Sequence, residues 1–311
     1  MTGGVASARW PIKRLLLILG LVATCYAVAL LLWGHERSVS LSVLWSSTGL
    51  QAASLCLLSY VLRGLRWRLW MAHYSRHFGW VEGLRLYLAG YAFTPTPGNA
   101  GEAMRGLMLA HKPLSLLQSL AIFGAERLAD LLCLLLLCTP ALLWLLKHSA
   151  FEGMAGWLVG LAVVALLVFF VLAGVVWRNR QRLLLRFGWL QDAWTCLSVR
   201  PVVWFGLTLT AWAAQGIAMW LICRALDVHL LLVTAIGFYS VAMVAGALSA
   251  LPAGLGGMEL VLTSLLVTQS ASTAEALTIT VLTRLLTLWL AVAIGVAALL
   301  YSAFVRKDIR F

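Results

Sequence analysis

The feature that most constrains this chain is a series of uncharged apolar runs, each about as long as a membrane is thick. Residues 15–32 and 157–176 contain no charged side chain, and a helix needs about 20 residues to cross the hydrocarbon of a bilayer. Only 11% of the 311 residues are charged and 62% are hydrophobic, whereas a soluble domain carries about 25% charged residues. The sequence therefore predicts an all-α polytopic membrane protein and excludes a soluble enzyme, a disordered region or a secreted disulfide scaffold. A β-barrel would alternate polar and apolar residues in segments of about 10.

We expect one integral membrane domain over residues 1–311, with about six full spans. The predicted spans are 12–33, 41–62, 114–146, 156–177, 201–223 and 274–303. The first apolar run is longer than the apolar region of a signal peptide, so we expect it to remain as an anchor. The six cysteines form no CxxC pair and are expected to be small buried hydrophobic residues.

Two further regions, 82–112 and 230–270, consist of short apolar pieces broken by proline and glycine. The residues at the two breaks are Pro95, Pro97, Gly98 and Gly101, and Pro252, Gly254, Gly256 and Gly257. Irregular backbone at membrane depth is tolerated only where protein buries it or where it lines a wet cavity. We therefore predict two re-entrant helical hairpins that meet a cavity near the middle of the membrane.

The charge distribution suggests how the chain is oriented. The formal net charge is +12, which we attribute to the excess of Lys and Arg in cytoplasmic loops rather than to a nucleic-acid partner. The arginine clusters within 63–85 and 178–200, and both termini, are predicted to be cytoplasmic. This holds only if each broken region returns to the side that it entered, the first from the cytoplasm and the second from the opposite face. The protein is thus expected in the cytoplasmic (inner) membrane.

An internal repeat relates the two halves, approximately 1–150 and 151–311. A shift of 157 residues places Pro95 on Pro252, Glu102 on Glu259 and Arg127 on Arg284. Because the two hairpins enter from opposite faces, the repeat predicts inverted topology, which is a common transporter plan.

Seven ionisable residues within membrane segments are candidates for a substrate-binding site, because each costs about 2.5–3.5 kcal/mol to insert. They are Glu102, Arg105, Glu126, Arg127, Asp130, Glu259 and Arg284. Arg127 and Arg284 would supply forked donors that suit a phosphate, and the hairpins would add helix N-termini with free N–H groups. The carboxylates would balance the arginines or bind a cationic group. The alternative is a set of structural salt bridges, and the two interpretations are compatible.

No catalytic residue, metal site or cofactor is predicted. The sequence has no G-x-S-x-G, H-E-x-x-H, P-loop or GxGxxG motif of a nucleotide fold. His73 and His77 have the spacing of a metal pair but no third ligand. Intramembrane enzymes can use dispersed residues, so an enzyme stays an alternative.

Four short motifs resemble one family in order and spacing: PGNAGEAMR at 97–105, ERLAD at 126–130, PAGLGGME at 252–259, and Arg284. This is the transmembrane region of the lysylphosphatidylglycerol synthase family, the flippase-like module of bacterial multiple-peptide-resistance proteins. The resemblance implies a lipid flippase, acting on aminoacylated phosphatidylglycerol or, as in other relatives, on polyprenyl-phosphate-linked sugars. It assigns the polar positions of the family to the seven residues above. This chain has Asn99 where relatives often have a basic residue, and it has no synthase domain after Phe311, so we expect it not to make an aminoacylated lipid itself.

The leading hypothesis is a translocase for an anionic, phosphate-bearing membrane lipid. No nucleotide-binding motif is present, so transport would be downhill, coupled to an ion, or driven by consumption of the lipid. One alternative is a non-catalytic partner that docks an envelope-lipid synthase or glycosyltransferase through the basic loops. The other is an intramembrane transferase or hydrolase acting on a lipid-linked sugar, with Glu102 or Glu259 as general base.

Overall fold

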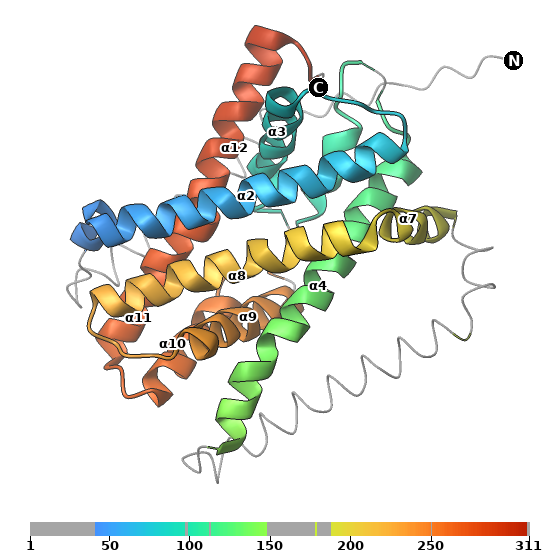
Figure 1. The fold of residues 1–311 in the computed structure, drawn as a ribbon. Helices are drawn as coiled ribbons and strands as arrows, with labels where there is room; N and C mark the ends of the chain where they lie inside the picture. Colours follow the sequence, from blue (N-terminus) through green and yellow to red (C-terminus); the bar gives the residue numbers. More distant parts are fainter. Residues whose placement is uncertain are drawn as a thin grey trace, which may run out of the picture.

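The computed structural model describes residues 41–96, 99–111, 113–147, 178, 188–249 and 251–309. Every regular element named in these ranges is a helix (Figure 1). In the first half they are η1 (Leu41–Trp45), α2 (Ser47–His73), α3 (Trp80–Ala89), η2 (Gly90–Phe93), η3 (Ala100–Gly106) and α4 (Leu116–Lys147). In the second half they are α7 (Gly188–Ser198), α8 (Pro201–Ala225), α9 (Leu232–Leu248), α10 (Gly257–Thr268), α11 (Thr273–Arg284), η5 (Leu285–Trp289), α12 (Leu290–Leu300) and η6 (Tyr301–Arg306).

Three helices are long and apolar enough to cross a membrane, as judged by length and composition. They are Leu116–Leu145, Pro201–Ala225 and the continuous helix Thr273–Arg306, which combines α11, η5, α12 and η6. They coincide with the predicted spans 114–146, 201–223 and 274–303. The predicted spans 12–33 and 156–177, and the break residues Pro97 and Gly98, lie outside the described residues. The chain is an all-α polytopic membrane protein.

Local sequence explains where the helices begin. Ser46 caps α2 by accepting a hydrogen bond from the Gly49 N–H at 3.1 Å, which satisfies a free amide of the first turn. Pro201 starts α8, where its missing N–H costs nothing. Ser272 and Glu275 form a reciprocal capping box at the start of α11.

Helix α2 corrects one prediction. The sequence predicts a span ending at residue 62, followed by cytoplasmic arginines, but α2 continues to His73. Arg63 is 9% exposed and Arg66 is 0% exposed. These two arginines therefore do not belong to a solvated loop cluster. Both face the interior: Arg66 is paired there with the carboxylates of Glu126 and Asp130, whereas Arg63 contacts the amide of Gln215 and the ring of Trp212.

The two breaks differ in structure. In the second, α9 and α10 pack against each other and are joined by a turn in which Gly254 and Gly256 have φ of +66° and +86°, a conformation that other residues adopt only at a cost. In the first, α3 and η2 lead through a turn to η3, so the returning arm is one short 3₁₀ helix. The insertion of either hairpin into the membrane stays a prediction.

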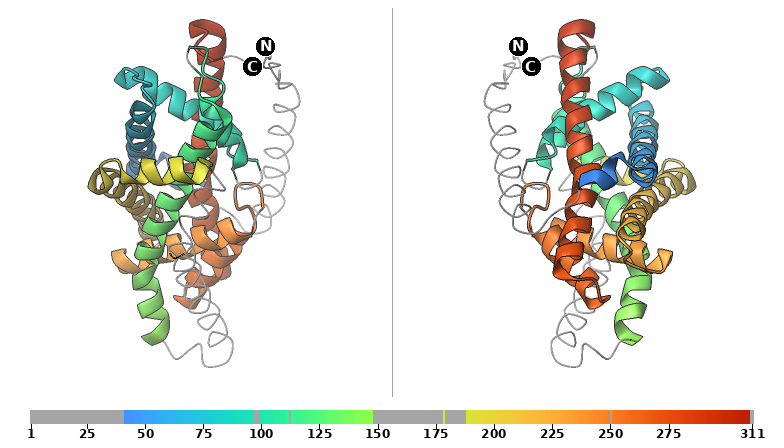
Figure 2. Two further views of the ribbon diagram at one scale, coloured as in Figure 1. Left: turned by 90° about the vertical axis from the view of Figure 1, so that its right-hand side faces the viewer. Right: turned by 90° about the vertical axis from the view of Figure 1, so that its left-hand side faces the viewer.

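The arrangement of the helices brings the two halves together at the centre. Helices α2 and α8 pack side by side and cross the long helices α4 and α11–α12 (Figures 1 and 2). Helix α9 packs on α4, and α3 packs on α12. A shift of 157 residues places Ala100 on Gly257 and Leu116 on Thr273, which are the first residues of η3, α10, α4 and α11. The repeat relates α4 to the helix that begins with α11 and continues as α12, and it relates α3 to α9. The contact of α4 with α9 therefore corresponds to the contact of α12 with α3. The inverted topology stays a prediction.

Candidate substrate cavity

A cavity of about 390 Å³ lies between the two halves of the chain. Polar residues of the first half that line it include Glu102, Arg127 and Asp130. The second half contributes Arg284 and three residues of the second break, Leu251, Ala253 and Gly254. The elements that supply these residues are η3, α4, α11 and the turn before α10. The cavity therefore joins the arginines that the repeat relates, Arg127 and Arg284.

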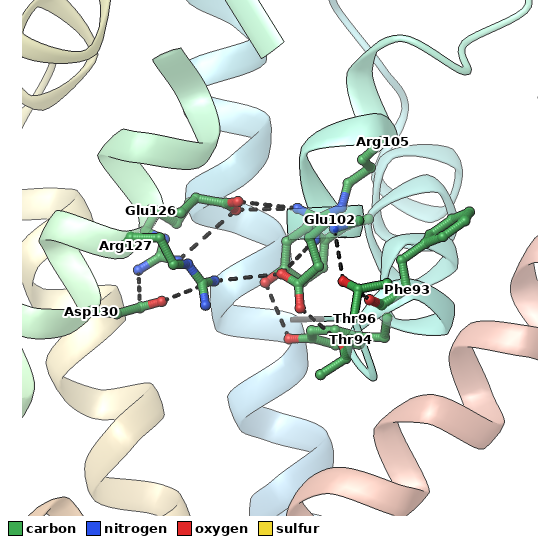
Figure 3. A network of polar contacts seen from close by, with 12 residues as sticks. Phe93, Thr94, Thr96, Glu102, Arg105, Glu126, Arg127 and Asp130 are labelled. Carbon is green, nitrogen blue, oxygen red and sulfur yellow. Dashed lines mark hydrogen bonds and ion pairs between the residues drawn. The ribbon is translucent and has the colours of Figure 1, made fainter. Parts of the chain in front are cut away.

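Three arginines and three carboxylates beside the cavity alternate in a closed ring, which we call the charge ring. Its contacts, in order, are Arg66–Asp130 (2.6 Å), Asp130–Arg127 (3.3 Å), Arg127–Glu102 (3.5 Å), Glu102–Arg105 (3.2 Å), Arg105–Glu126 (3.3 Å) and Glu126–Arg66 (4.0 Å). Figure 3 shows the part of this ring that η3 and α4 form. Every carboxylate contacts two arginines. Because the ring contains three arginines and three carboxylates, it is electrically neutral as a whole.

Burial divides the charge ring into two sides. The side chain of Arg66 is 0% exposed and that of Arg105 is 3% exposed, whereas that of Arg127 is 36% exposed. Thr94 also donates to Glu102, with 2.9 Å between the oxygens (Figure 3). Charges removed from water require this degree of pairing. The ring therefore fixes η3 to α4 and α2, and it presents one arginine, Arg127, to the cavity.

The second half contains a matching but simpler pair. Arg284 Nε lies 2.6 Å from Glu259 Oε1, and Arg284 Nη2 donates to the carbonyl of Ala253 at 2.9 Å. Glu259 and Arg284 are separated in sequence by 25 residues, as are Glu102 and Arg127. The repeat predicted from the sequence thus produces an ion pair at the same spacing in each half.

Glu259 also changes what the start of α10 can do. The N–H of Gly256 donates to Glu259 Oε2 at 2.7 Å, so the carboxylate of this helix caps its own first turn. This N–H is therefore not free to bind an anion, while the expectation that the hairpins offer helix N-termini to an anion stays a prediction. In the first break, the returning arm η3 is a short 3₁₀ helix.

A local irregularity follows Arg284 in the long C-terminal helix. Residues Leu285–Trp289 form a π-helical turn, which leaves carbonyl groups without their usual helical partners. The hydroxyl of Tyr60 on α2 donates to the carbonyl of Leu286 at 2.7 Å. Tyr60 and Thr287 both line the cavity, so this turn shapes the wall beside Arg284.

The seven residues predicted from the sequence occupy two kinds of position. Glu102, Arg127, Asp130 and Arg284 line the cavity, whereas Arg105, Glu126 and Glu259 are not part of its lining and support it from behind. A role in substrate binding for any of them stays a prediction. Five of the cysteines, namely Cys56, Cys133, Cys138, Cys196 and Cys223, are free and buried, as expected; Cys25 lies outside the described residues.

Sequence reasoning missed the contribution of α2 and α8. Arg63 lines the cavity with its guanidinium 3.9 Å above the ring of Trp212, and it donates to Gln215 Oε1 at 3.2 Å. Tyr239 donates to the same amide oxygen at 2.8 Å. The three-residue spacing of Arg63 and Arg66, which places both on one face of a helix, was the available signal, but the surrounding arginines concealed it.

The arrangement suits an anion better than a cation. Both oxygens of Glu102 accept hydrogen bonds from described residues, and both oxygens of Asp130 lie within 3.3 Å of an arginine nitrogen, although Asp130 Oδ2 has no hydrogen-bond donor among the described residues. By contrast, Arg127 Nε and Arg63 Nε are buried atoms with no hydrogen-bond acceptor among the described residues. Buried donors without acceptors are costly, so a ligand that accepts hydrogen bonds and carries negative charge would be stabilised here.

The fold and the cavity define a polytopic helical membrane protein with a charged chamber shared by its two halves. Its sequence matches the family described as lysylphosphatidylglycerol synthase TM region over residues 16–295. The chain therefore belongs to that family, a membrane family linked to lipid synthesis or lipid flipping. No curated protein matches the sequence.

Proposed function

We propose that this protein is a translocase that moves an anionic, phosphate-bearing lipid across the membrane. The observation that carries the proposal is the shared cavity, in which arginines from both halves, Arg127 and Arg284, face one space. A headgroup phosphate would enter this space while the lipid tails stay in the bilayer. Membership of a family linked to lipid synthesis or flipping supports the same proposal.

The size and lining of the cavity support a headgroup rather than a whole lipid. A volume of about 390 Å³ falls in the range of small-molecule pockets. Guanidinium groups bind phosphate through two parallel donors. Aminoacyl-phospholipids and polyprenyl-phosphate-linked sugars both carry such a phosphate next to long tails, and these are the substrate classes that we propose.

The geometry favours a transporter over the transferase alternative. A general base needs a free carboxylate within reach of the substrate. Glu259 is not part of the cavity lining and is paired with Arg284 at 2.6 Å, while Glu102 contacts Arg105 and Arg127. The pairing of both glutamates with arginines therefore supports a transporter.

Translocation in proteoliposomes tests the proposal. The purified chain is reconstituted with labelled phosphatidylglycerol, its lysyl form, polyprenyl phosphate or a polyprenyl-phosphate sugar, and accessibility to a membrane-impermeant reagent is followed. We expect one class to move. Arg127→Gln and Arg284→Gln should each slow it by about tenfold or more, because each removes charge-assisted hydrogen bonds.

Arg224→Gln is the matched control, because Arg224 is exposed at the end of α8 and stacks on Trp220 away from the cavity. It should transport at the wild-type rate. Undiminished transport in well-folded Arg127→Gln and Arg284→Gln variants would refute the anion site. No transport of any lipid, with stable co-purification of a synthase or glycosyltransferase, would favour the partner alternative.

A further inference from the structure

Arg63 differs from the other arginines at the centre of the molecule. Arg66, Arg105, Arg127 and Arg284 each have a carboxylate within 4.0 Å. Among the described residues, Arg63 has none at that distance; its contacts are the amide oxygen of Gln215 and the face of Trp212. Arg63 is 9% exposed and lines the cavity, and its Nε has no acceptor in the described part of the chain.

A charge count over the described residues around the cavity leaves one positive charge. The charge ring contains as many carboxylates as arginines, and the Glu259–Arg284 pair is neutral. The remaining charge is that of Arg63. An unpaired buried cation is expensive, and neither an amide nor an aromatic ring neutralises it, although each offsets part of the cost.

We infer that Arg63, beside Arg127 and Arg284, supplies the unpaired positive charge that binds the phosphate, and that the ligand carries a single negative charge there. This rests on the proposed function and deepens it by naming the substrate class: a lipid whose phosphate is a diester. A diester brings one negative charge, which Arg63 neutralises. A phosphomonoester or a diphosphate brings further negative charge, for which the described cavity has no second unpaired cation.

The test compares lipids with the same tails, one with a diester phosphate that carries a glycerol headgroup and one with a bare monoester phosphate. Dihexanoyl phosphatidylglycerol is a diester, and dihexanoyl phosphatidic acid is a monoester with the same tails. Titration calorimetry of the purified full chain in detergent should show phosphatidylglycerol binding at least about tenfold more tightly, because a second charge is left unpaired at low dielectric. Equal or tighter binding of phosphatidic acid would overturn the inference.

Substitutions at Arg63 separate binding from folding. Arg63→Met should weaken phosphatidylglycerol binding by about tenfold or more, without lowering the thermal midpoint of the ligand-free protein, because it removes an unpaired buried charge. Arg63→Lys should retain part of the affinity, because it keeps the charge but not the forked geometry. A merely structural Arg63 would give the opposite pattern: a lower midpoint with unchanged affinity.

Arg68→Gln is the matched control on the same helix. Arg68 also stacks on a tryptophan, Trp80, at 4.4 Å, but it does not line the cavity, so its loss should leave affinity unchanged. An equal loss of affinity in Arg68→Gln would overturn the assignment. Dimethyl phosphate and inorganic phosphate distinguish a lipid from a free anion; binding of either as tightly as the lipid would overturn the lipid assignment.

The assignment of Arg63 and the translocase proposal can fail independently. If phosphatidylglycerol binds through Arg63 but no lipid crosses the proteoliposome membrane, the translocase proposal fails and the binding site stands. If transport proceeds but Arg63→Met binds and transports normally, the translocase proposal stands and this inference fails.

Discussion

At the residue scale, the central feature is the charge ring, in which no arginine or carboxylate stands alone. The sequence predicts part of it: the three-residue spacing of Glu102 and Arg105 places them on one face, and they contact at 3.2 Å. It also leaves open whether these residues form a site or salt bridges. The structure shows that the salt bridges are present and that Arg127 faces the cavity with 36% of its side chain exposed.

Asp130 should be essential to the stability of the ring, because it contacts Arg66 at 2.6 Å and Arg127 at 3.3 Å. Asp130→Asn leaves the buried charge of Arg66 poorly compensated, which costs about 3–5 kcal/mol. Thermal unfolding in detergent should show the loss, and the double variant Arg66→Met with Asp130→Leu should recover most of it. Asp192→Asn, on α7 outside the ring, is the control. A wild-type midpoint for Asp130→Asn would show that the ring contributes nothing to stability.

Arg105 and Arg127 should separate stability from transport. Arg105 is 3% exposed and lies behind the cavity lining, whereas Arg127 is 36% exposed and lines the cavity. We therefore expect Arg105→Gln to lower the unfolding midpoint more, since pairs that are partly exposed contribute less. Arg127→Gln should instead slow lipid movement at a nearly normal midpoint. The reverse ranking in either assay would contradict the division of the ring into two sides.

At the element scale, the helices are largely predictable because their apolar runs and start signals agree, as in α4, α8 and the Thr273–Arg306 helix. The returning arm of the first break is not. Nothing in residues 99–106 distinguishes a 3₁₀ helix from an α-helix; η3 is fixed by Glu102 and Arg105 bonding to α4. The end of α2 could not be predicted from the sequence either, because its buried arginines are stabilised by partners more than 60 residues away in sequence.

The packing of η2 against η3 depends on a glycine. A Cβ at Gly90 would overlap the guanidinium of Arg105, with only 2.8 Å to Cζ, and Arg105 cannot move freely because Glu102 and Glu126 hold it. Gly90→Ala should therefore destabilise the protein by about 1–3 kcal/mol through overpacking. The thermal midpoint in detergent measures this cost.

Gly206→Ala provides the comparison, because a Cβ there meets nothing within 4 Å. It should leave stability unchanged or raise it by up to about 1 kcal/mol, since alanine is the better helix former. Equal effects of the two substitutions would show that the position of Arg105 does not depend on Gly90.

At the scale of the whole molecule, the cavity lies where the two repeats meet. The sequence shows the repeat as three matched positions: a proline, a glutamate and an arginine. The glutamate and the arginine form an ion pair in each half, Glu102–Arg127 and Glu259–Arg284, which is the physical reason for those two matches. The cavity itself could be expected from two broken helices, but its full lining could not. Arg63, Trp212 and Gln215 come from α2 and α8, whose side-by-side packing is a tertiary fact that no local pattern encodes.

Alternating access predicts that cavity residues face each side of the membrane in turn. Ala247, which lines the cavity, is replaced by cysteine in a chain whose six native cysteines are substituted. An impermeant thiol reagent should modify it from either side of oriented proteoliposomes, and more slowly when substrate lipid is present. A cysteine at Ala211, which is 0% exposed on α8, should stay unmodified. Modification of Ala247→Cys from one side alone would indicate a fixed pocket.

The role of the shared cavity in lipid movement is best measured in proteoliposomes that contain the wild-type chain or Arg127→Gln. We expect one class of anionic phosphate-bearing lipid to cross the membrane in the presence of the wild-type chain. In the folded variant we expect the rate to fall by about tenfold or more, because a charge-assisted contact with the headgroup is lost. Equal rates in the two proteins would contradict the claim that the shared cavity carries the headgroup.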